Sequence, residues 1–409
     1  MFRFILPILL LASVAAEPAK RIPAPKPPEG FPKFEVEEID TGLKIGYAVI
    51  AVDVDGDKKP DIVVVDQLQV VWYQNPTWKK RIILDGKTKP DNVCITAMDI
   101  DGDGLPELVV GAGWKPFDTK TPGTLQWLKR GKTLDEEWSM YPIPCDEPTV
   151  HRIRAFDMDG DGKPELVSVP LMGREATKEK NWMDGRPVNI TMYKIPAKDP
   201  EKPENWKPEV VSSELHVAHN FDVFPTGKGN DLIVASYEGI SRVNRPKGSE
   251  LGSKLLFNKA NQDNPIGNRG ASEIKLSDDS MRIATIEPWH GNQVVVYEQG
   301  GGGMLPRKLV DDQLRWGHAI NWLESDKEQF LVAGVRDNPT KDDTFTEKRG
   351  VRLYRHNLKT DKWERYILED GGVAVEDLTV ADLNGDGKPD IVAVGRATGN
   401  ARIYWNMGK

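Results

Sequence analysis

Short apolar runs occur along the chain in pairs, and a polar loop separates the two members of each pair. The runs before the loop are AVIAV, CITAM, RIRAF and LTVA, and the runs after it are IVVV, LVVG, LVSV and IVAV. Runs of four to eight residues bounded by turn residues are typical of buried β-strands and are too short for most helices. The pattern therefore predicts pairs of neighbouring strands, each joined by a polar turn.

The four polar loops share one pattern: DVDGDKKPD from Asp53, DIDGDGLPE from Asp99, DMDGDGKPE from Asp157 and DLNGDGKPD from Asp382. Oxygen-bearing side chains occupy loop positions 1, 3, 5 and 9, and a glycine at position 4 allows the positive φ that folds the chain around an ion. Ca²⁺ takes six to eight such oxygens. A solvated acidic turn is the alternative, but recurrence at one strand-to-strand position favours calcium. The predicted calcium ligands are Asp53, Asp55, Asp57, Asp61, Asp99, Asp101, Asp103, Glu107, Asp157, Asp159, Asp161, Glu165, Asp382, Asn384, Asp386 and Asp390.

Between the third and fourth loops the strand–loop–strand unit persists around Asp222, Ile274 and Trp322 without its oxygen ligands. This gives seven units, each with two further strand candidates such as VNITMYKI and WKPEVVSS. Repeated units of four short strands predict an all-β fold, a seven-bladed β-propeller. The last unit ends after ARIYWN and lacks an outer strand, whereas FEVEEI from Phe34 has no unit of its own. We expect this N-terminal strand to complete the last blade and close the ring.

The ends and the composition set the context of this domain. Residues 1–16 combine one basic residue, an apolar run and small residues, which predicts a signal peptide and a secreted or periplasmic protein. Residues 17–32 are rich in Pro and Lys and are predicted to be a linker, so the propeller spans 33–409. A net charge of −8 argues against a nucleic acid partner, and no later apolar run is long enough to span a membrane. Cys94 and Cys145 are interpreted as two free thiols in preference to a disulfide.

Histidines mark the face of the predicted propeller opposite the calcium loops. The chain has six, and five of them stand near the start of a first strand or the end of a second strand: His151, His216, His219, His290 and His318. Glu376, followed by Asp377, takes this place in the last unit, and His356 lies in mid-strand and is predicted to be at the surface. A single histidine of this kind is most often structural. Their joint placement at one end of the axis favours a functional site.

Other polar and aromatic residues are predicted to surround this axial site. Imidazole nitrogen suits transition metals such as Zn²⁺ better than it suits calcium. We therefore predict a possible divalent metal site from His216, His219, His290 and Glu287. The second strands of several units end in polar residues, namely Arg174, Arg336, Arg396 and Glu238. The candidates for the walls of the site are Trp114, Trp289 and Trp316. Of these, Trp289, Trp316, Arg396 and Glu238 are the predicted contacts to a carbohydrate or another polar small molecule.

Two resemblances extend these predictions. The four loops resemble the FG-GAP/VCBS repeats of integrin-type propellers over about residues 33–409, which implies seven blades with Ca²⁺ in the turns. The segments HRIRAFDMDGDG, HVAHNFDVF, EPWHGNQVVVYE and GHAINWL resemble the propeller domains of aldos-2-ulose dehydratase-type proteins over about residues 145–340. That family implies metal-assisted elimination of water from a keto-sugar.

The second resemblance assigns chemical roles to the axial residues. A metal polarises the ketone, and His151 or His318 removes the neighbouring proton as a neutral imidazole. Arg174 or Arg336, or a second histidine, stabilises the resulting negative charge. The alternative hypothesis is a calcium-stabilised propeller that binds glycan or protein without catalysis. The group of histidines favours the enzyme, because a binding module needs aromatic and amide groups more than imidazoles.

Overall fold

The computed structural model describes residues 20–247, 250–257, 268–298, 306–314, 316–325, 328–336 and 348–409, with backbone alone for 245–247 and 250–257. The predicted signal peptide and residues 17–19 of the predicted linker lie outside this part of the chain. Two short 3-10 turns, Lys178–Lys180 and Pro203–Asn205, accompany the strands. None of the described residues forms a helix long and apolar enough to cross a membrane.

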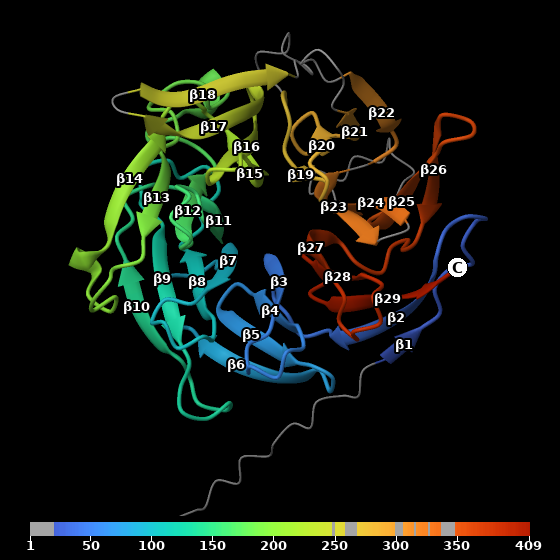
Figure 1. The fold of residues 1–409 in the computed structure, drawn as a ribbon, viewed down its shortest axis with the longest axis horizontal. Helices are drawn as coiled ribbons and strands as arrows, with labels where there is room; N and C mark the ends of the chain where they lie inside the picture. Colours follow the sequence, from blue (N-terminus) through green and yellow to red (C-terminus); the bar gives the residue numbers. More distant parts are fainter. Residues whose placement is uncertain are drawn as a thin grey trace, which may run out of the picture.

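The strands form seven antiparallel sheets arranged around one axis, as predicted (Figure 1). Blade one contains β3 (Ala48–Val52), β4 (Asp61–Val65), β5 (Gln69–Gln74) and β6 (Lys79–Asp85). Blade two contains β7 (Cys94–Met98), β8 (Glu107–Ala112), β9 (Thr124–Lys129) and β10 (Ser139–Ile143). Blade three contains β11 (Val150–Phe156), β12 (Glu165–Pro170), β13 (Ile190–Lys194) and β14 (Lys207–Ser212).

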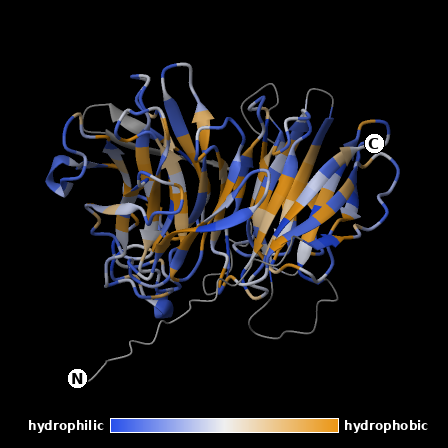
Figure 2. Cartoon of the chain, turned by 90° about the horizontal axis from the view of Figure 1, so that it is seen from below, coloured by the Kyte–Doolittle hydropathy of each residue, from blue (hydrophilic) through white to orange (hydrophobic). Residues whose placement is uncertain are grey.

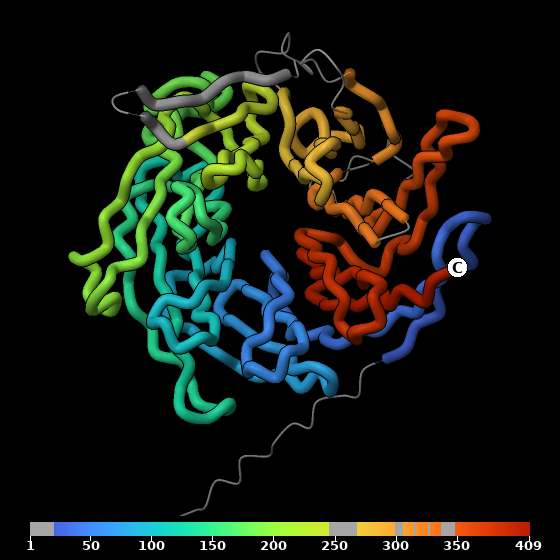
Figure 3. Tube along the Cα trace, in the orientation of Figure 1, coloured from blue at the N-terminus to red at the C-terminus, as the bar shows by residue number. Residues whose placement is uncertain are grey.

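Blades four to six follow the same order. Blade four contains β15 (Ala218–Pro225), β16 (Asn230–Ser236), β17 (Gly239–Lys247) and β18 (Glu250–Phe257). Blade five contains β19 (Ile274–Leu276), β20 (Arg282–Glu287), β21 (Gln293–Glu298) and β22 (Arg307–Asp311). Blade six contains β23 (Gly317–Ser325), β24 (Glu328–Val335), β25 (Gly350–Asn357) and β26 (Lys362–Ile367). The first strand of every blade lies nearest the axis of the ring (Figure 3).

The seventh blade joins the two ends of the chain. Its order is β27 (Val375–Ala381), β28 (Asp390–Gly395), β29 (Ala401–Gly408), β2 (Lys33–Asp40) and β1 (Lys20–Ile22). Val36 in β2 pairs with Tyr404 in β29, which confirms the predicted closure. Ile22 in β1 pairs in turn with Val36, so part of the predicted linker forms a fifth strand. The N-terminal strands and the C-terminus lie side by side in Figure 1.

The second strands of the blades form the buried layers between neighbouring sheets. All five residues of β4, with the sequence DIVVV, are buried. Val63 and Trp72 of blade one pack in the same cluster as Ile95 and Leu108 of blade two. Because each sheet is covered on both faces, its second strand is mostly apolar after its polar first residue and does not alternate. Figure 2 shows this hydrophobic interior running through the strands.

Four of the axial strands carry a β-bulge at their second residue. The pairing register shifts between Val150 and Arg152 in β11, and it shifts at the same place in β15, β23 and β27. The residues skipped by the register are His151, His219, His318 and Glu376. A bulge redirects the side chain at its extra residue. His219 in β15 therefore occupies the position that His151 occupies in β11. The sequence analysis gave this position to His216, and that prediction is wrong.

Both cysteines are free thiols in the structure, which agrees with the interpretation of the sequence. Cys94 is buried in β7, and Cys145 is partly buried after β10. Burial raises the pKa of Cys94 to about 12. Neither thiol is therefore suited to act as a nucleophile at neutral pH.

Candidate functional site

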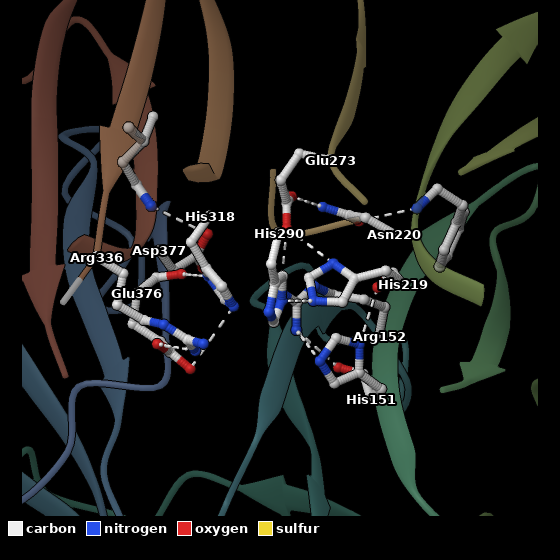
Figure 4. A network of polar contacts seen from close by, with 12 residues as sticks. His151, Arg152, His219, Asn220, Glu273, His290, His318, Arg336, Glu376 and Asp377 are labelled. Atoms are coloured by element: carbon white, nitrogen blue, oxygen red, sulfur yellow. Dashed lines mark hydrogen bonds and ion pairs between the residues drawn. The ribbon is translucent and has the colours of Figure 1, made fainter. Parts of the chain in front are cut away.

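Three histidines from three successive blades meet at the end of the axis. His219 belongs to β15, His290 follows β20, and His318 belongs to β23. One ring nitrogen from each lies within 4.8 Å of the others, and all three side chains are buried. Nε2 of His219 is 2.8 Å from Nε2 of His290 (Figure 4). Sequence reasoning placed His219 and His290 in a metal site and His318 in a catalytic role. The structure brings all three together, and we call them the histidine trio.

Neighbouring groups fix which nitrogen of each ring is free to bind. Nδ1 of His318 donates to the backbone oxygen of Glu376 at 2.5 Å. Nδ1 of His219 lies 2.9 Å from Oε1 of Glu273. With Nδ1 carrying the proton, the lone pair of each ring is on Nε2, the atom that faces the other histidines. Metal-ligating histidines have this arrangement, in which a carboxylate or carbonyl oxygen holds the second ring nitrogen.

His290 completes the trio from a loop with an unusual backbone. Its φ is +49°, a conformation that L-residues rarely adopt. Its ring stacks on Trp289, with ring centres 3.9 Å apart and planes inclined by 16°. Nδ1 of His290 is buried and has no hydrogen-bond partner among the described residues. Two imidazole nitrogens 2.8 Å apart share either a proton or a metal ion, so a divalent metal fits the trio.

A fourth histidine lies beside the trio without joining it. The ring centres of His151 and His219 are 4.6 Å apart, and Nδ1 of His151 donates to the backbone oxygen of His219 at 2.8 Å. Nη1 of Arg152 lies 3.3 Å from Nε2 of His151. Because Nδ1 donates, the lone pair of His151 is on Nε2, where it accepts from Arg152. A substrate proton would have to take the place of Arg152 for His151 to act as a general base.

Burial keeps the four histidines uncharged. Loss of solvent lowers the pKa of His151 and of His290 well below 6.5, and nearby positive groups lower it further. Burial likewise lowers the pKa of His219, and it lowers that of His318 to about 3. A neutral imidazole is the form that binds metals and accepts protons.

A carboxylate and two guanidinium groups form the adjacent part of the site. Glu376 accepts from Nη1 of Arg336 at 2.9 Å and from Nη1 of Arg396 at 2.6 Å. Burial would raise the pKa of Glu376, but the charges of Arg336 and Arg396 hold it well below its usual range. The arginines also contact aromatic rings, Arg336 at 5.4 Å from Trp316 and Arg396 at 5.2 Å from Tyr47. The two guanidinium groups are therefore fixed in place.

These groups open into a cavity of about 530 Å³ at the axial end of the ring. The polar part of its lining consists of His151, Arg152, His219, His290, His318, Arg336, Glu376 and Arg396. The apolar part consists of Ile45, Val93, Pro116, Leu171 and Ala397 with the aromatic residues Tyr47, Trp114, Phe117, Trp289 and Trp316. A cavity with apolar walls and a few converging polar groups is the usual form of a small-molecule site. The predicted substrate contacts Trp289, Trp316 and Arg396 all line it.

The four acidic loops lie at the opposite ends of their strands and have the same internal bonding. Asp53 accepts from the backbone N–H of Gly56 at 2.7 Å and of Lys58 at 2.8 Å, and Asp382 makes the same bonds within its own loop. The acid at position 9 accepts from the backbone of position 2, as Asp61 does from Val54 at 3.0 Å. Carboxylate oxygens converge within 4.8 Å in the first three loops. The loops therefore have the oxygen-lined shape that the sequence predicts.

Comparison with known protein families agrees with this geometry. The FG-GAP-like repeat family matches residues 53–110. The family described as the β-propeller domain of aldos-2-ulose dehydratase matches residues 122–300. The chain is a seven-bladed propeller, and the part of it from residue 53 to residue 110 matches FG-GAP-like repeats. No curated protein matches it at a significant level.

Solved structures resemble this FG-GAP propeller in fold alone. BBS1N in complex with ARL6DN is 12% identical, with a TM-score of 0.57 and coverage of 92% of this chain and 96% of that one. The RRP9 WD40 repeats are 10% identical, with a TM-score of 0.55 over 90% and 96% of the two chains. A protein from Lactobacillus plantarum is also 10% identical, with a TM-score of 0.54 over 86% and 89%. Identities this low carry no information on the ligand.

Four predicted site residues of the FG-GAP propeller lie away from the trio. His216 lies 2.8 Å from Glu238, and neither lines the cavity. Glu287, predicted as a metal ligand, accepts from Thr285, Tyr297 and Arg307 inside blade five. Arg174, predicted as catalytic, lies in the loop after β12 and donates to the backbone oxygen of Lys120. The structure thus gives none of the four a direct part in the axial site.

Sequence reasoning missed Glu273 and Asn220 beneath the trio, and it named Asp377 without giving it a role. Glu273, just before β19, accepts from Nδ2 of Asn220 at 2.5 Å in addition to its contact with His219. Burial would raise the pKa of Glu273, but His219 and Arg152 lower it to about 2. Asp377 accepts from the backbone of Val49 at 2.9 Å. Glu273 directly precedes its strand, and the bulged histidines are the second residues of theirs. This position near the start of the first strand of a blade was the available signal.

The acidic loops of the FG-GAP propeller differ in the side chain that the third strand of the blade brings to them. In blade three Nζ of Lys194 lies 3.1 Å from Asp161 and 3.7 Å from Glu165, and it also contacts Asp159. In blade two Nζ of Lys129 lies 2.6 Å from Asp101. In blade one the corresponding residue is Gln74, whose amide donates to Asp55 at 2.6 Å. An ammonium group competes with a cation for the same oxygens, so blade one offers calcium the better site.

Proposed function

We propose that this FG-GAP propeller is an exported, metal-dependent carbon–oxygen lyase that eliminates water from keto-sugars. The observation that carries the proposal is the histidine trio, with three Nε2 lone pairs converging at the wall of an axial cavity. The match of the aldos-2-ulose dehydratase propeller family over residues 122–300 supports the sugar-related chemistry. The predicted signal peptide supports export.

The proposed chemistry assigns separate tasks to the residues around the cavity. A divalent metal bound by His219, His290 and His318 would polarise the carbonyl of the substrate. His151 accepts the neighbouring carbon-bound proton at Nε2 and returns it to the departing hydroxyl. Arg336 and Arg396 stabilise negative charge that develops on substrate oxygen. Glu273 and the backbone of Glu376 favour the metal-binding tautomers of His219 and His318.

The direct test is an assay of water elimination. Protein loaded with Zn²⁺, Mn²⁺ or Fe²⁺ is incubated with aldos-2-uloses and related keto-sugars, and the conjugated product is followed by its ultraviolet absorbance and by mass. We expect turnover with at least one of these metals and none after chelation. Stoichiometric metal binding without turnover of any keto-sugar would contradict the lyase proposal.

A second candidate function is glycan binding without catalysis. Phe117 at the cavity is 59% exposed and stacks on Trp182 at 5.2 Å, an arrangement suited to the face of a sugar ring. Binding of an oligosaccharide that needs neither the metal nor His151 would favour this candidate. Loss of binding in Phe117→Ala would locate the glycan at the cavity.

We also propose that the acidic loops bind structural calcium. When the free calcium concentration is about 100 times the Kd of a loop, binding to that loop stabilises the folded state by about 2.7 kcal/mol. This free energy corresponds to several degrees in Tm. Removing calcium with a chelator should therefore lower Tm by several degrees, and added calcium should restore it. Asp53→Asn should remove part of this calcium-dependent shift. An unchanged Tm on chelation, measured by calorimetry, would contradict structural calcium.

The lysine in blade three gives a sharper test of the loops. A unit charge about 5 Å from a divalent ion repels it by about 1.7 kcal/mol even in water. Lys194→Met should therefore strengthen calcium binding at the third loop by roughly tenfold at low salt. Lys207→Met on the same blade is the matched control, because Lys207 contacts the backbone of Glu204 and none of the loop carboxylates. Calorimetric titration of both variants measures the difference, and equal affinities would show that Lys194 does not compete.

A further inference from the structure

The charged groups that line the axial cavity are mostly positive. Three of them are the guanidinium groups of Arg152, Arg336 and Arg396, and the fourth is the carboxylate of Glu376. The four histidines are neutral because burial lowers their pKa values. The chain as a whole carries a net charge of −8. The positive lining is therefore a local feature that runs against the charge of the protein.

The other carboxylates near the site do not neutralise this lining. Glu273 lies beneath the trio and is engaged by His219 and Asn220. Asp377 is engaged by the backbone of Val49. Neither of them lines the cavity. A ligand in the cavity thus meets the guanidinium groups and not these acids.

Arg336 and Arg396 occupy equivalent places in neighbouring blades, one residue beyond β24 and one beyond β28. Each uses one Nη atom to bind Glu376. A guanidinium group has five N–H donors, so each arginine can bind a second acceptor through another edge. Nε of Arg336 is buried and has no hydrogen-bond partner among the described residues. Glu376 therefore orients the pair and leaves donors for a ligand.

We propose that the ligand of the axial cavity carries a carboxylate, which Arg336 and Arg396 bind while the carbon skeleton reaches the histidine trio. The preferred substrate class is then a sugar acid, such as an aldonate, a uronate or a keto acid derived from one, over a neutral sugar. Paired guanidinium groups match the geometry of a carboxylate. Trp114 and Leu171 also line the cavity and offer apolar surface to the uncharged part of the ligand. This inference rests on the proposed function for the reaction and names the substrate class of the same site.

The test compares ligands that differ only in the acid group. Binding of D-gluconate and D-glucitol, and of D-glucuronate and D-glucose, is measured by calorimetry on the metal-loaded protein. We expect the acid of each pair to bind at least about tenfold more tightly, with an affinity that falls as salt rises. Arg396→Gln should remove most of this preference, and Arg396→Lys should keep part of it. Arg174→Gln, outside the cavity, should leave it unchanged.

Loss of one arginine leaves the buried carboxylate of Glu376 with one guanidinium partner in place of two, which can itself disturb folding. The double variant Arg396→Gln with Glu376→Gln removes both charges and keeps the test valid. Equal affinity for the acid and the neutral sugar in the native protein would overturn the inference. Turnover of neutral keto-sugars with no preference for acids would overturn it while leaving the lyase proposal intact. Arginine-dependent binding of acids without metal or turnover would uphold the carboxylate subsite and refute the lyase.

Discussion

Replacing His219 and His290 together with alanine should abolish binding of the transition metal and all metal-dependent turnover. The two rings supply two of the three converging Nε2 atoms, and their nitrogens lie 2.8 Å apart. Outer partners of metal ligands alone contribute about 10- to 100-fold in affinity, so removing two ligands should weaken metal binding by more than about 10³-fold. Metal analysis of the purified protein and competition with a chromophoric chelator measure this loss.

Three comparisons keep this result specific. His216→Gln, in a histidine that contacts Glu238 and not the trio, should retain the metal. Glu273→Gln should weaken metal binding by about 10- to 100-fold, because it changes only the partner of His219. Calcium bound by the acidic loops should be the same in all variants. A double variant that keeps a full equivalent of transition metal would show that the trio is not the metal site.

Replacing His151 with glutamine should lower kcat by about 10²- to 10⁴-fold, the usual contribution of a general base. The metal content should not change, because His151 is outside the trio and meets it through the backbone oxygen of His219. Since glutamine can still accept from Arg152, KM should change far less than kcat. Steady-state kinetics on the substrate identified by the elimination assay, with metal analysis of the same samples, separates these effects.

Two outcomes would exclude this role for His151. A kcat within about threefold of the native protein would mean that another group, or metal-bound water, takes the proton. A parallel loss of metal and of activity would mean that His151 serves the metal site.

The fold could be predicted from the sequence because the loops repeat at a fixed place between apolar strands. The DxDGDG pattern and runs such as IVVV define the first two strands of a blade, and FEVEEI had no partner other than the incomplete last unit. The structure confirms both the ring and its closure. These features depend on the local hydrophobic pattern and on the need to leave no strand edge unpaired. Both can be recognised in the amino-acid sequence.

Membership of the axial site could be predicted only in part. His151, His219, His290 and His318 were placed at the correct end of the axis, but His216 and Glu287 were included wrongly. The sequence analysis located these residues by counting back along the strand from the acidic loop. This count fails because a β-bulge inserts one residue, and a shift of one residue turns a side chain to the other face of the strand. Glu273 was missed because blade five has no acidic loop to set the count. The position of a β-bulge depends on tertiary contacts, which the hydrophobic periodicity of the sequence does not reveal.

The closure of the ring bears on when the protein becomes able to hold its metal. The carbonyl that orients His318 belongs to Glu376, in β27, and β27 lies in the one sheet that needs strands from both ends of the chain. During synthesis, residue 33 emerges long before residue 408, so this sheet is the last to be completed. We expect the trio to stay disorganised until β2 meets β29. Under the proposed export, the protein would then take its metal from the compartment in which it folds and not from the cell interior.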